Sequence, residues 1–247
     1  MSFDASVKTD SAESKNKSSV RMYRLMPFAD FEKTLANWGI RASVPYQNIN
    51  PYENMPLFST VSEMYASLPE RRSSSLCSFS CIPECTSPVM WGIYAERGRG
   101  ICLQFDFPGN SSEESDIVTT FGEAVDGEGK FELKEVNYTE EEYRSRKDSD
   151  ESLLLNKPPC WKYEKEHRFI KKIEEASDYV DGRFYFRTPV QYLTGIILGP
   201  KCPHSPSAVK KMFELARNKR SEANLKNQQV NVSQSVLDDT KFLINVK

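Results

Sequence analysis

Residues 160–170 have the sequence CWKYEKEHRFI, in which aromatic and charged side chains alternate. In a β-strand, successive side chains point to opposite faces. A strand over this segment would therefore carry two sets of side chains: Trp161, Tyr163 and Phe169 on one face, and Glu164, Glu166 and Arg168 on the other. The alternation predicts a half-buried strand with an aromatic core face.

The charged face of this predicted strand has two interpretations. Glu164 and Glu166 can form salt bridges with Arg168 on a solvated surface, which is the common use of such residues. Alternatively, the two carboxylates face a cleft and take part in chemistry. Both interpretations stay open at this point.

The rest of the chain contains further strand-like and helix-like segments. Strands are predicted at residues 20–26, 76–79, 100–107, 130–138, 183–187, 192–198 and 241–247, and helices at 28–38, 87–95 and 205–221. This order predicts a single α+β domain over residues 21–247, with a mixed or antiparallel sheet flanked by a few helices.

The composition is typical of a soluble globular protein. The chain has 247 residues, of which 38% are hydrophobic and 28% charged, and its formal net charge of −2 gives no overall attraction for polyanions. Residues 1–20 are rich in serine and lysine and are expected to form a disordered leader, with a non-classical export signal as the alternative. No stretch approaches the roughly 18 to 20 apolar residues of a membrane helix, so we expect a cytoplasmic protein without a membrane partner.

Three of the six cysteines, Cys77, Cys81 and Cys85, are regularly spaced. This spacing lacks the pair of cysteines two residues apart that is typical of zinc sites. Pro83 would also interrupt a helix that aligned the three thiols. We therefore expect small buried cysteines and no metal site.

The segment ERGRGI at residues 96–101 contains two closely spaced glycines. It follows a predicted helix and precedes a predicted strand, which reverses the order of a dinucleotide-binding loop. Gly98 and Gly100 are therefore expected to end the helix and form a turn. A nucleic-acid-binding or nuclease function is a further alternative, and it would use the basic residues Arg71, Arg72, Arg97 and Arg99.

Five segments share a recognisable order and spacing: FS at residues 79–80, MWGIYAERGRGICLQFD at 90–106, VNY at 136–138, WKYEKEHR at 161–168 and LTGIILG at 193–199. Together they resemble a bacterial family catalogued as domain of unknown function 2971, over about residues 22–199. The Asn-Asp-Pro-Phe-Glu motif of that family appears here only as INPYEN, which keeps Asn50, Pro51 and Glu53 but lacks the aspartate. The resemblance says little about a reaction.

A second resemblance is to ADP-ribosyltransferases of the arginine-serine-glutamate type. Those enzymes carry an arginine on the first strand, a serine on a later strand and a Glu-x-Glu pair near a further strand. Arg24, Ser80 and the segment Glu164-Lys165-Glu166 follow the same order here, with Ser78 as a substitute for Ser80. The resemblance implies an ADP-ribosyltransferase-like fold with NAD as the substrate, in which Arg24 binds phosphate and Ser80 positions the ribose or the glutamate.

The chemistry of NAD cleavage gives the two acids separate roles. Breaking the nicotinamide–ribose bond builds positive charge on the ribose, and a carboxylate bonded to the 2′-hydroxyl stabilises that charge. The resemblance gives this role to Glu166, and Glu164 would orient or deprotonate the incoming nucleophile. Tyr94 or Trp91 could stack on the nicotinamide, and the alternative is that these helix residues belong to the hydrophobic core.

These inferences predict an NAD-dependent ADP-ribosyltransferase or NAD glycohydrolase that acts in phage defence or as a toxin. Its catalytic residues are Glu166 and Glu164, and its NAD-binding residues are Arg24, Ser80 and Tyr94. Its acceptor is water, a protein or a nucleic acid. The alternative is a non-enzymatic sensing or interaction module of a bacterial defence system, in which the acids and Arg168 form an ion network.

Overall fold

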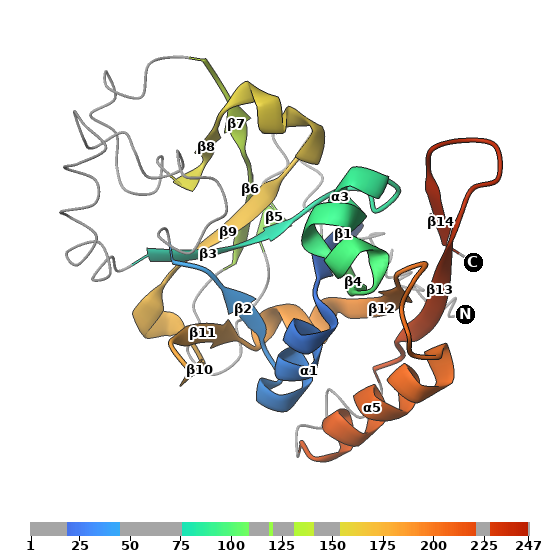
Figure 1. The fold of residues 1–247 in the computed structure, drawn as a ribbon. Coiled ribbons are helices and arrows are strands. Elements are labelled where there is room, and N and C mark those ends of the chain that lie inside the picture. The colour runs from blue at the N-terminus through green and yellow to red at the C-terminus, as the bar shows by residue number, and fades with distance from the viewer. Residues whose placement is uncertain are drawn as a thin grey trace, which may run out of the picture.

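The computed structural model describes residues 19–44, 76–108, 119–120, 131–140, 154–220 and 228–246. Within these ranges the chain forms four β-sheets and three α-helices: α1 (Phe28–Asn37), α3 (Pro88–Tyr94) and α5 (Pro206–Asn218) (Figure 1). The α+β class predicted from the sequence is confirmed.

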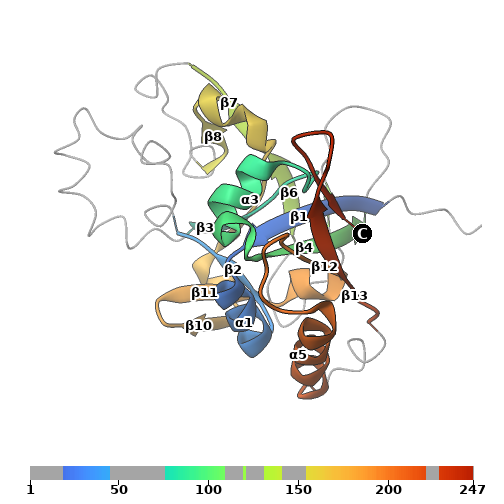
Figure 2. The same ribbon diagram turned by 45° about the vertical axis from the view of Figure 1, so that its right-hand side comes forward.

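The largest sheet has five strands in the order β1 (Ser19–Met26), β4 (Ile101–Pro108), β12 (Leu193–Leu198), β13 (Asn231–Leu237) and β14 (Ile244–Val246). Strands β12 and β13 run parallel, and the other neighbouring pairs are antiparallel. The sheet is therefore mixed. Figure 2 shows α3 beside β1 and α5 next to β13.

A second sheet is antiparallel, with four strands in the order β3 (Leu76–Cys81), β9 (His167–Lys172), β6 (Glu132–Glu135) and β5 (Thr119–Thr120). Two smaller sheets contain β10 (Asp178–Val180), β11 (Arg183–Phe186) and β2 (Ile40–Ala42), and the parallel pair β7 (Asn137–Tyr138) and β8 (Asn156–Lys157). Reciprocal backbone hydrogen bonds of 2.8 Å between Tyr23 and Ile82 join β1 to the segment after β3.

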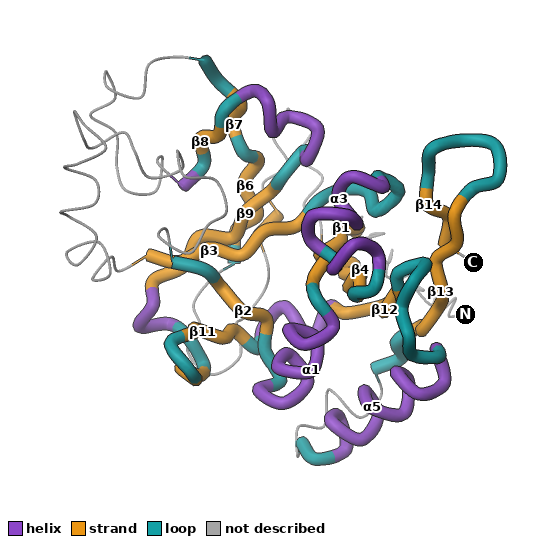
Figure 3. Tube along the Cα trace, in the orientation of Figure 1, coloured by secondary structure: helices purple, strands orange, loops and turns teal. Residues whose placement is uncertain are grey.

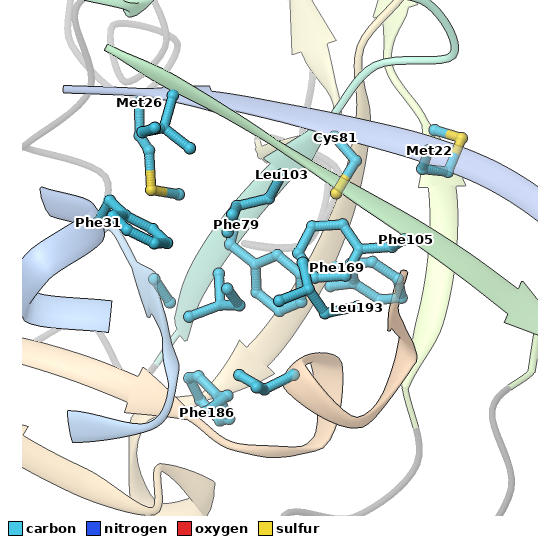
Figure 4. Packing of buried hydrophobic residues seen from close by; sticks show 14 of the residues in the cluster. Met22, Met26, Phe31, Phe79, Cys81, Leu103, Phe105, Phe169, Phe186 and Leu193 are labelled. Atoms are coloured by element: carbon cyan, nitrogen blue, oxygen red, sulfur yellow. The ribbon is translucent and has the colours of Figure 1, made fainter. Parts of the chain in front are cut away.

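Strand β4 alternates between two hydrophobic clusters. One face contributes Ile101, Leu103, Phe105 and Phe107 to the main core, which Figure 4 shows from close by. The other face places Cys102 in a smaller cluster with Trp91 of α3 and Ile197 of β12. Farther along this second face, Gln104 and Asp106 are half-buried, so β4 is apolar on both faces only at its start and then alternates between apolar and polar residues.

Phe169 of β9 lies at the centre of the main core. Its ring centroid is 4.6 Å from that of Phe79, 5.3 Å from that of Phe107 and 5.8 Å from that of Phe131. Phe79 belongs to β3 and Phe107 to β4, so Phe169 packs against residues of both large sheets.

The segment CWKYEKEHRFI does not form the single strand that its alternation predicts. Residues Pro159–Glu164 form a 3₁₀-helix, Lys165 takes a left-handed conformation with φ of 49°, and β9 begins only at His167. Figure 3 shows this change from helix to strand just before β9. Proline has a fixed φ that suits the first turn of a helix, so Pro159 favours helix over strand at this point.

The predicted leader, residues 1–20, also needs a correction. Strand β1 begins at Ser19, so residues 19 and 20 belong to the first strand. Residues 1–18 lie outside the described part of the chain, and so do Asn50, Pro51 and Glu53 of the INPYEN motif.

Candidate functional site

A cavity of about 310 Å³ lies where β1 meets β3, beside α3. The residues predicted for the site come from separate elements: Arg24 from β1, Ser80 from β3, Tyr94 from α3, Glu164 from the end of the 3₁₀-helix, and Glu166 from the residues just before β9. All five line this one cavity. The structure therefore brings the predicted residues together, while the role of each residue stays a prediction.

The 3₁₀-helix decides which side chains of the segment face the cavity. A 3₁₀-helix has three residues per turn, so side chains three positions apart share a face. Trp161 and Glu164 are three positions apart, and both line the cavity. The side chain of Tyr163 does not line the cavity, and it is 46% exposed. The aromatic face predicted for a strand, with Trp161 and Tyr163 together in the core, is therefore wrong.

Glu166 is held by four donated hydrogen bonds. Arg168 binds it bidentately, with Nε 2.7 Å from Oε1 and Nη2 2.8 Å from Oε2. The Ser80 hydroxyl also donates to Oε1, and Lys157 Nζ lies 3.1 Å from Oε2. The register of β3 and β9 explains this arrangement, because Ser80 is directly opposite Arg168.

These partners fix the charge of Glu166. Burial alone would raise its pKa, but Arg168, Lys157 and Ser80 together outweigh burial and hold the pKa at about 2. The carboxylate is therefore ionised throughout the physiological pH range. Each of its oxygens already accepts two hydrogen bonds, which is close to the capacity of a carboxylate.

Glu164 accepts fewer hydrogen bonds than Glu166, and its pKa is shifted in the opposite direction. The Tyr94 hydroxyl donates to its Oε1 at 2.5 Å, and Lys157 Nζ donates to its Oε2. Burial raises the pKa of Glu164, and Lys157 and Tyr94 offset this effect only in part. Two neighbouring acids whose pKa values are pushed apart by their surroundings are a common arrangement in acid–base catalysis.

Tyr94 and Trp91 both belong to α3 but face different parts of the protein. Burial and the hydrogen bond to Glu164 raise the pKa of Tyr94, so its hydroxyl keeps its proton and acts as a donor. Trp91 is completely buried in the smaller cluster, where its indole Nε1 donates to the carbonyl of Cys85 at 2.7 Å. Trp91 is therefore a core residue, which agrees with the core alternative and excludes stacking on a ligand in the cavity.

Arg24 is a cation on the core-facing side of β1, between Met22 and Met26. Its guanidinium donates to the backbone carbonyls of Ser80 at 2.9 Å and Arg41 at 3.1 Å. It forms no salt bridge with a carboxylate of the described residues. Burial lowers its pKa. Because an arginine side chain keeps its proton in proteins, the site contains a guanidinium charge that an anion could bind.

Some residues of this site are not among those predicted from the sequence. Lys157 and Arg41 line the cavity, and the Tyr138 hydroxyl accepts a 2.8 Å hydrogen bond from the backbone N–H of Glu166. Tyr138 lies in the VNY segment of the family resemblance, which was a usable signal. Lys157 and Arg41 stand in no motif, and only the folded structure brings them near the acids.

The cysteines fit the prediction of buried thiols. Cys77, Cys81 and Cys85 are all buried, and burial raises the pKa of the Cys81 thiol to about 12. The described residues contain no group of three or more metal-binding side chains. They also include no helix that is long and apolar enough to cross a membrane.

Part of the chain matches a known protein family. Residues 90–169 match the family model described as Protein of unknown function (DUF2971). The resemblance to this family is thereby supported over these residues, which include Tyr94, Lys157, Glu164 and Glu166, while Arg24 and Ser80 precede the match. No curated protein matches the chain. No solved structure matches it either, so the likeness to ADP-ribosyltransferases has no support from these comparisons.

Proposed function

We propose that the cavity binds NAD or a chemically similar nucleotide and cleaves the bond between its base and its ribose, as a glycohydrolase or an ADP-ribosyltransferase. The observation that carries this proposal is the convergence of Arg24, Ser80, Tyr94 and the two acids on one cavity of about 310 Å³. That volume is at the lower end of the range for small-molecule sites. Phage defence or toxicity is the setting we expect for such an activity.

The proposal assigns the reacting carboxylate to Glu164. Glu166 accepts hydrogen bonds from four donors, whereas each oxygen of Glu164 accepts one hydrogen bond from the described residues and keeps a lone pair for a ligand. A carboxylate beside the ribose stabilises the positive charge that develops as the bond to the base breaks. Glu166 then serves to hold Arg168 and Ser80 in place, which differs from the assignment implied by the resemblance.

The hydrolytic version of this reaction balances with water as the acceptor. The water oxygen bonds to ribose C1′, and the C1′–N bond breaks with its electron pair moving to the nicotinamide ring nitrogen. The proton of the attacking water passes to Glu164, whose raised pKa suits a proton acceptor near neutral pH. In the transferase version, a nucleophile on a protein or nucleic acid takes the place of water.

Arg24 supplies the charge that such a ligand needs. A nucleotide brings phosphate groups, and a guanidinium binds phosphate through parallel N–H donors. Because burial weakens solvent screening, an anion at this position would be bound more strongly than at an exposed arginine.

The direct test is to incubate the purified protein with NAD and to measure nicotinamide release. We expect turnover by the wild type and a decrease of about 10²- to 10⁴-fold in Glu164→Gln, which keeps the shape but removes the base. The matched control is Glu84→Gln, which changes an exposed glutamate that does not line the cavity. No nicotinamide release by the wild type, or full activity in Glu164→Gln, would contradict the proposal.

A non-enzymatic module is the second candidate. It is favoured by Glu166, both of whose oxygens already accept two hydrogen bonds from protein side chains. A carboxylate with a pKa of about 2 and every oxygen occupied is suited to holding elements together. This alternative predicts no heat of NAD binding in calorimetry. Saturable NAD binding that weakens at least tenfold in Arg24→Gln would count against it.

A further inference from the structure

Lys157 lies between the two acids and has no role in the function proposed above. It is the second residue of the short strand β8, and its side chain is only 5% exposed. Its ammonium donates to Oε2 of Glu164 and lies 3.1 Å from Oε2 of Glu166. The same nitrogen is 4.8 Å from the ring centroid of Trp161, which also lines the cavity.

The backbone around Lys157 is fixed by its pairing with β7. Tyr138 is its partner in the parallel register, and the N–H of Thr139 donates to the Lys157 carbonyl at 3.2 Å. Tyr138 also accepts the backbone N–H of Glu166 through its hydroxyl. The β7–β8 pair therefore sets the position of Lys157 relative to both acids before any ligand binds.

The two acids depend on Lys157 to different extents. Glu166 has its own bidentate partner in Arg168, so it keeps a cation without Lys157. Among the described residues, Lys157 is the only cation in a salt bridge with Glu164. The titratable groups that act on Glu164 are Lys157 from β8, Tyr94 from α3, Tyr138 from β7, and Glu166 and Tyr163 from its own segment.

We infer that Lys157 is a positioning residue that orients the carboxylate of Glu164 and keeps it ionised. The inference rests on the proposed function in one respect, because that function makes Glu164 the reacting group. Lys157 itself is not a nucleophile, since an ammonium bonded to two carboxylates has no lone pair to donate.

Removing the ammonium should make Glu164 take up a proton at higher pH. A carboxylate near a cation has its pKa lowered by about 1–3 units, and a buried carboxylate without that cation binds its proton more tightly. Lys157→Met keeps most of the side-chain length and the contact with Trp161 but removes the charge. Lys157→Arg keeps the charge and should restore most of the wild-type behaviour.

The experiment measures proton binding directly by NMR of the protein labelled with ¹³C at the glutamate carboxyl carbons. The Glu164 signal is assigned as the one missing from Glu164→Gln. We expect its titration midpoint to move up by about 1–3 pH units in Lys157→Met and by less than half as much in Lys157→Arg. If Lys157→Met does not fold, Lys157→Gln carries the same prediction.

The pH profile of nicotinamide release provides the second readout. Because Glu164 acts in its ionised form, the acid limb of the profile should move to higher pH by the same amount as the NMR midpoint. An unchanged midpoint in the folded, uncharged variant overturns the inference. A shifted midpoint in a protein that never releases nicotinamide supports the role of Lys157 and overturns the proposed function, so the two failures are distinguishable.

Discussion

Glu164 and Glu166 lie two positions apart in the chain, yet their surroundings shift their pKa values in opposite directions from that of an ordinary glutamate. Glu166 accepts hydrogen bonds from Arg168, Ser80 and Lys157, and its pKa is held at about 2. Glu164 is bonded to Lys157 and the neutral Tyr94 hydroxyl, and burial raises its pKa. Charged partners outweigh burial at Glu166 and not at Glu164, so Glu166 stays ionised to lower pH while Glu164 takes up a proton at higher pH.

Replacing Glu166 by glutamine should destabilise the protein strongly. The change removes one charge of a buried ion pair and leaves the Arg168 guanidinium, whose side chain is 3% exposed, without its carboxylate. We expect the free energy of unfolding to fall by about 3–5 kcal/mol at pH 7, measured by urea denaturation. Asp106→Asn is the matched control, because Asp106 binds Arg21 bidentately on the surface, and there we expect about 1 kcal/mol or less. Equal losses in the two variants would contradict this prediction.

The same variant gives a pH-dependent prediction. The pKa of Glu166 is about 2 in the folded protein, below the ordinary value of about 4.3 for an unfolded glutamate. Its stabilising contribution is therefore complete above about pH 4.3 and is lost as the pH falls toward 2. The difference in unfolding free energy between wild type and Glu166→Gln should shrink steadily from pH 5 to pH 3. A difference that stays constant over this range would show that the charge of Glu166 does not stabilise the fold.

The turn between α3 and β4 shows how a single element shapes the cavity. Glu96, Arg97 and Gly98 are successive residues with positive φ, of 49°, 60° and 82°. They turn the chain so that Gly100 packs against β1, where a Cβ on Gly100 would lie 2.3 Å from the carbonyl oxygen of Met26. Met26 lines the cavity, so this close backbone contact helps to fix one wall of the site.

Adding a methyl group at Gly100 should therefore be costly. Gly100→Ala forces the backbone of β1 or of the turn to move, because the clash is with a carbonyl oxygen and with Ala95. We expect a loss of about 1–3 kcal/mol in unfolding free energy, measured by thermal or urea denaturation. Gly92→Ala in α3 is the control, since a Cβ there meets nothing within 4 Å. A helical alanine should stabilise by about 0.5–1 kcal/mol, and the same sign for both variants would be inconsistent with the close contact at Gly100.

Elements with local signals could be predicted from the sequence, and elements that depend on distant partners could not. Helix α3 was predicted from Ser87 and Pro88, and the Ser87 hydroxyl accepts the N–H of Met90 at 3.4 Å as a cap. Strand β13 was missed because its polar side chains give no clear alternation, and its parallel partner β12 is remote in sequence. The 3₁₀-helix at Pro159–Glu164 has the sequence pattern of a strand because its aromatic and charged residues happen to alternate.

The residues of the candidate site also fall into those that could be predicted from the sequence and those that could not. Glu164 and Glu166 could be found because they stand in a distinctive segment, and Arg24 and Ser80 because they precede the two acids in the order of the arginine-serine-glutamate type. Lys157 could not be found, since nothing in its neighbourhood in the sequence marks it. It reaches the acids only through the pairing of β8 with β7 and the turn at Lys165.

At the scale of the whole molecule, one continuous core joins the two large sheets and two of the helices. The main cluster contains Phe31 of α1, Phe213 of α5, Phe105 of β4 and Phe169 of β9. The cavity lies between β1 and β3, which belong to different sheets, so its geometry depends on how the sheets are held together. A site of this kind is preserved only while the whole core is intact.

This dependence predicts a single cooperative unfolding transition. Phe169→Ala removes the ring that contacts aromatic residues from both sheets, and we expect a loss of about 3–5 kcal/mol in unfolding free energy. Far-UV circular dichroism and tryptophan fluorescence should report the same midpoint in the wild type, and both midpoints should shift together in the variant. Phe242→Ala is the control, because Phe242 is 98% exposed and its removal should leave both midpoints unchanged. Two separate transitions, of which Phe169→Ala moves only one, would mean that residues 21–247 do not form a single domain and that the cavity lies between units that unfold independently.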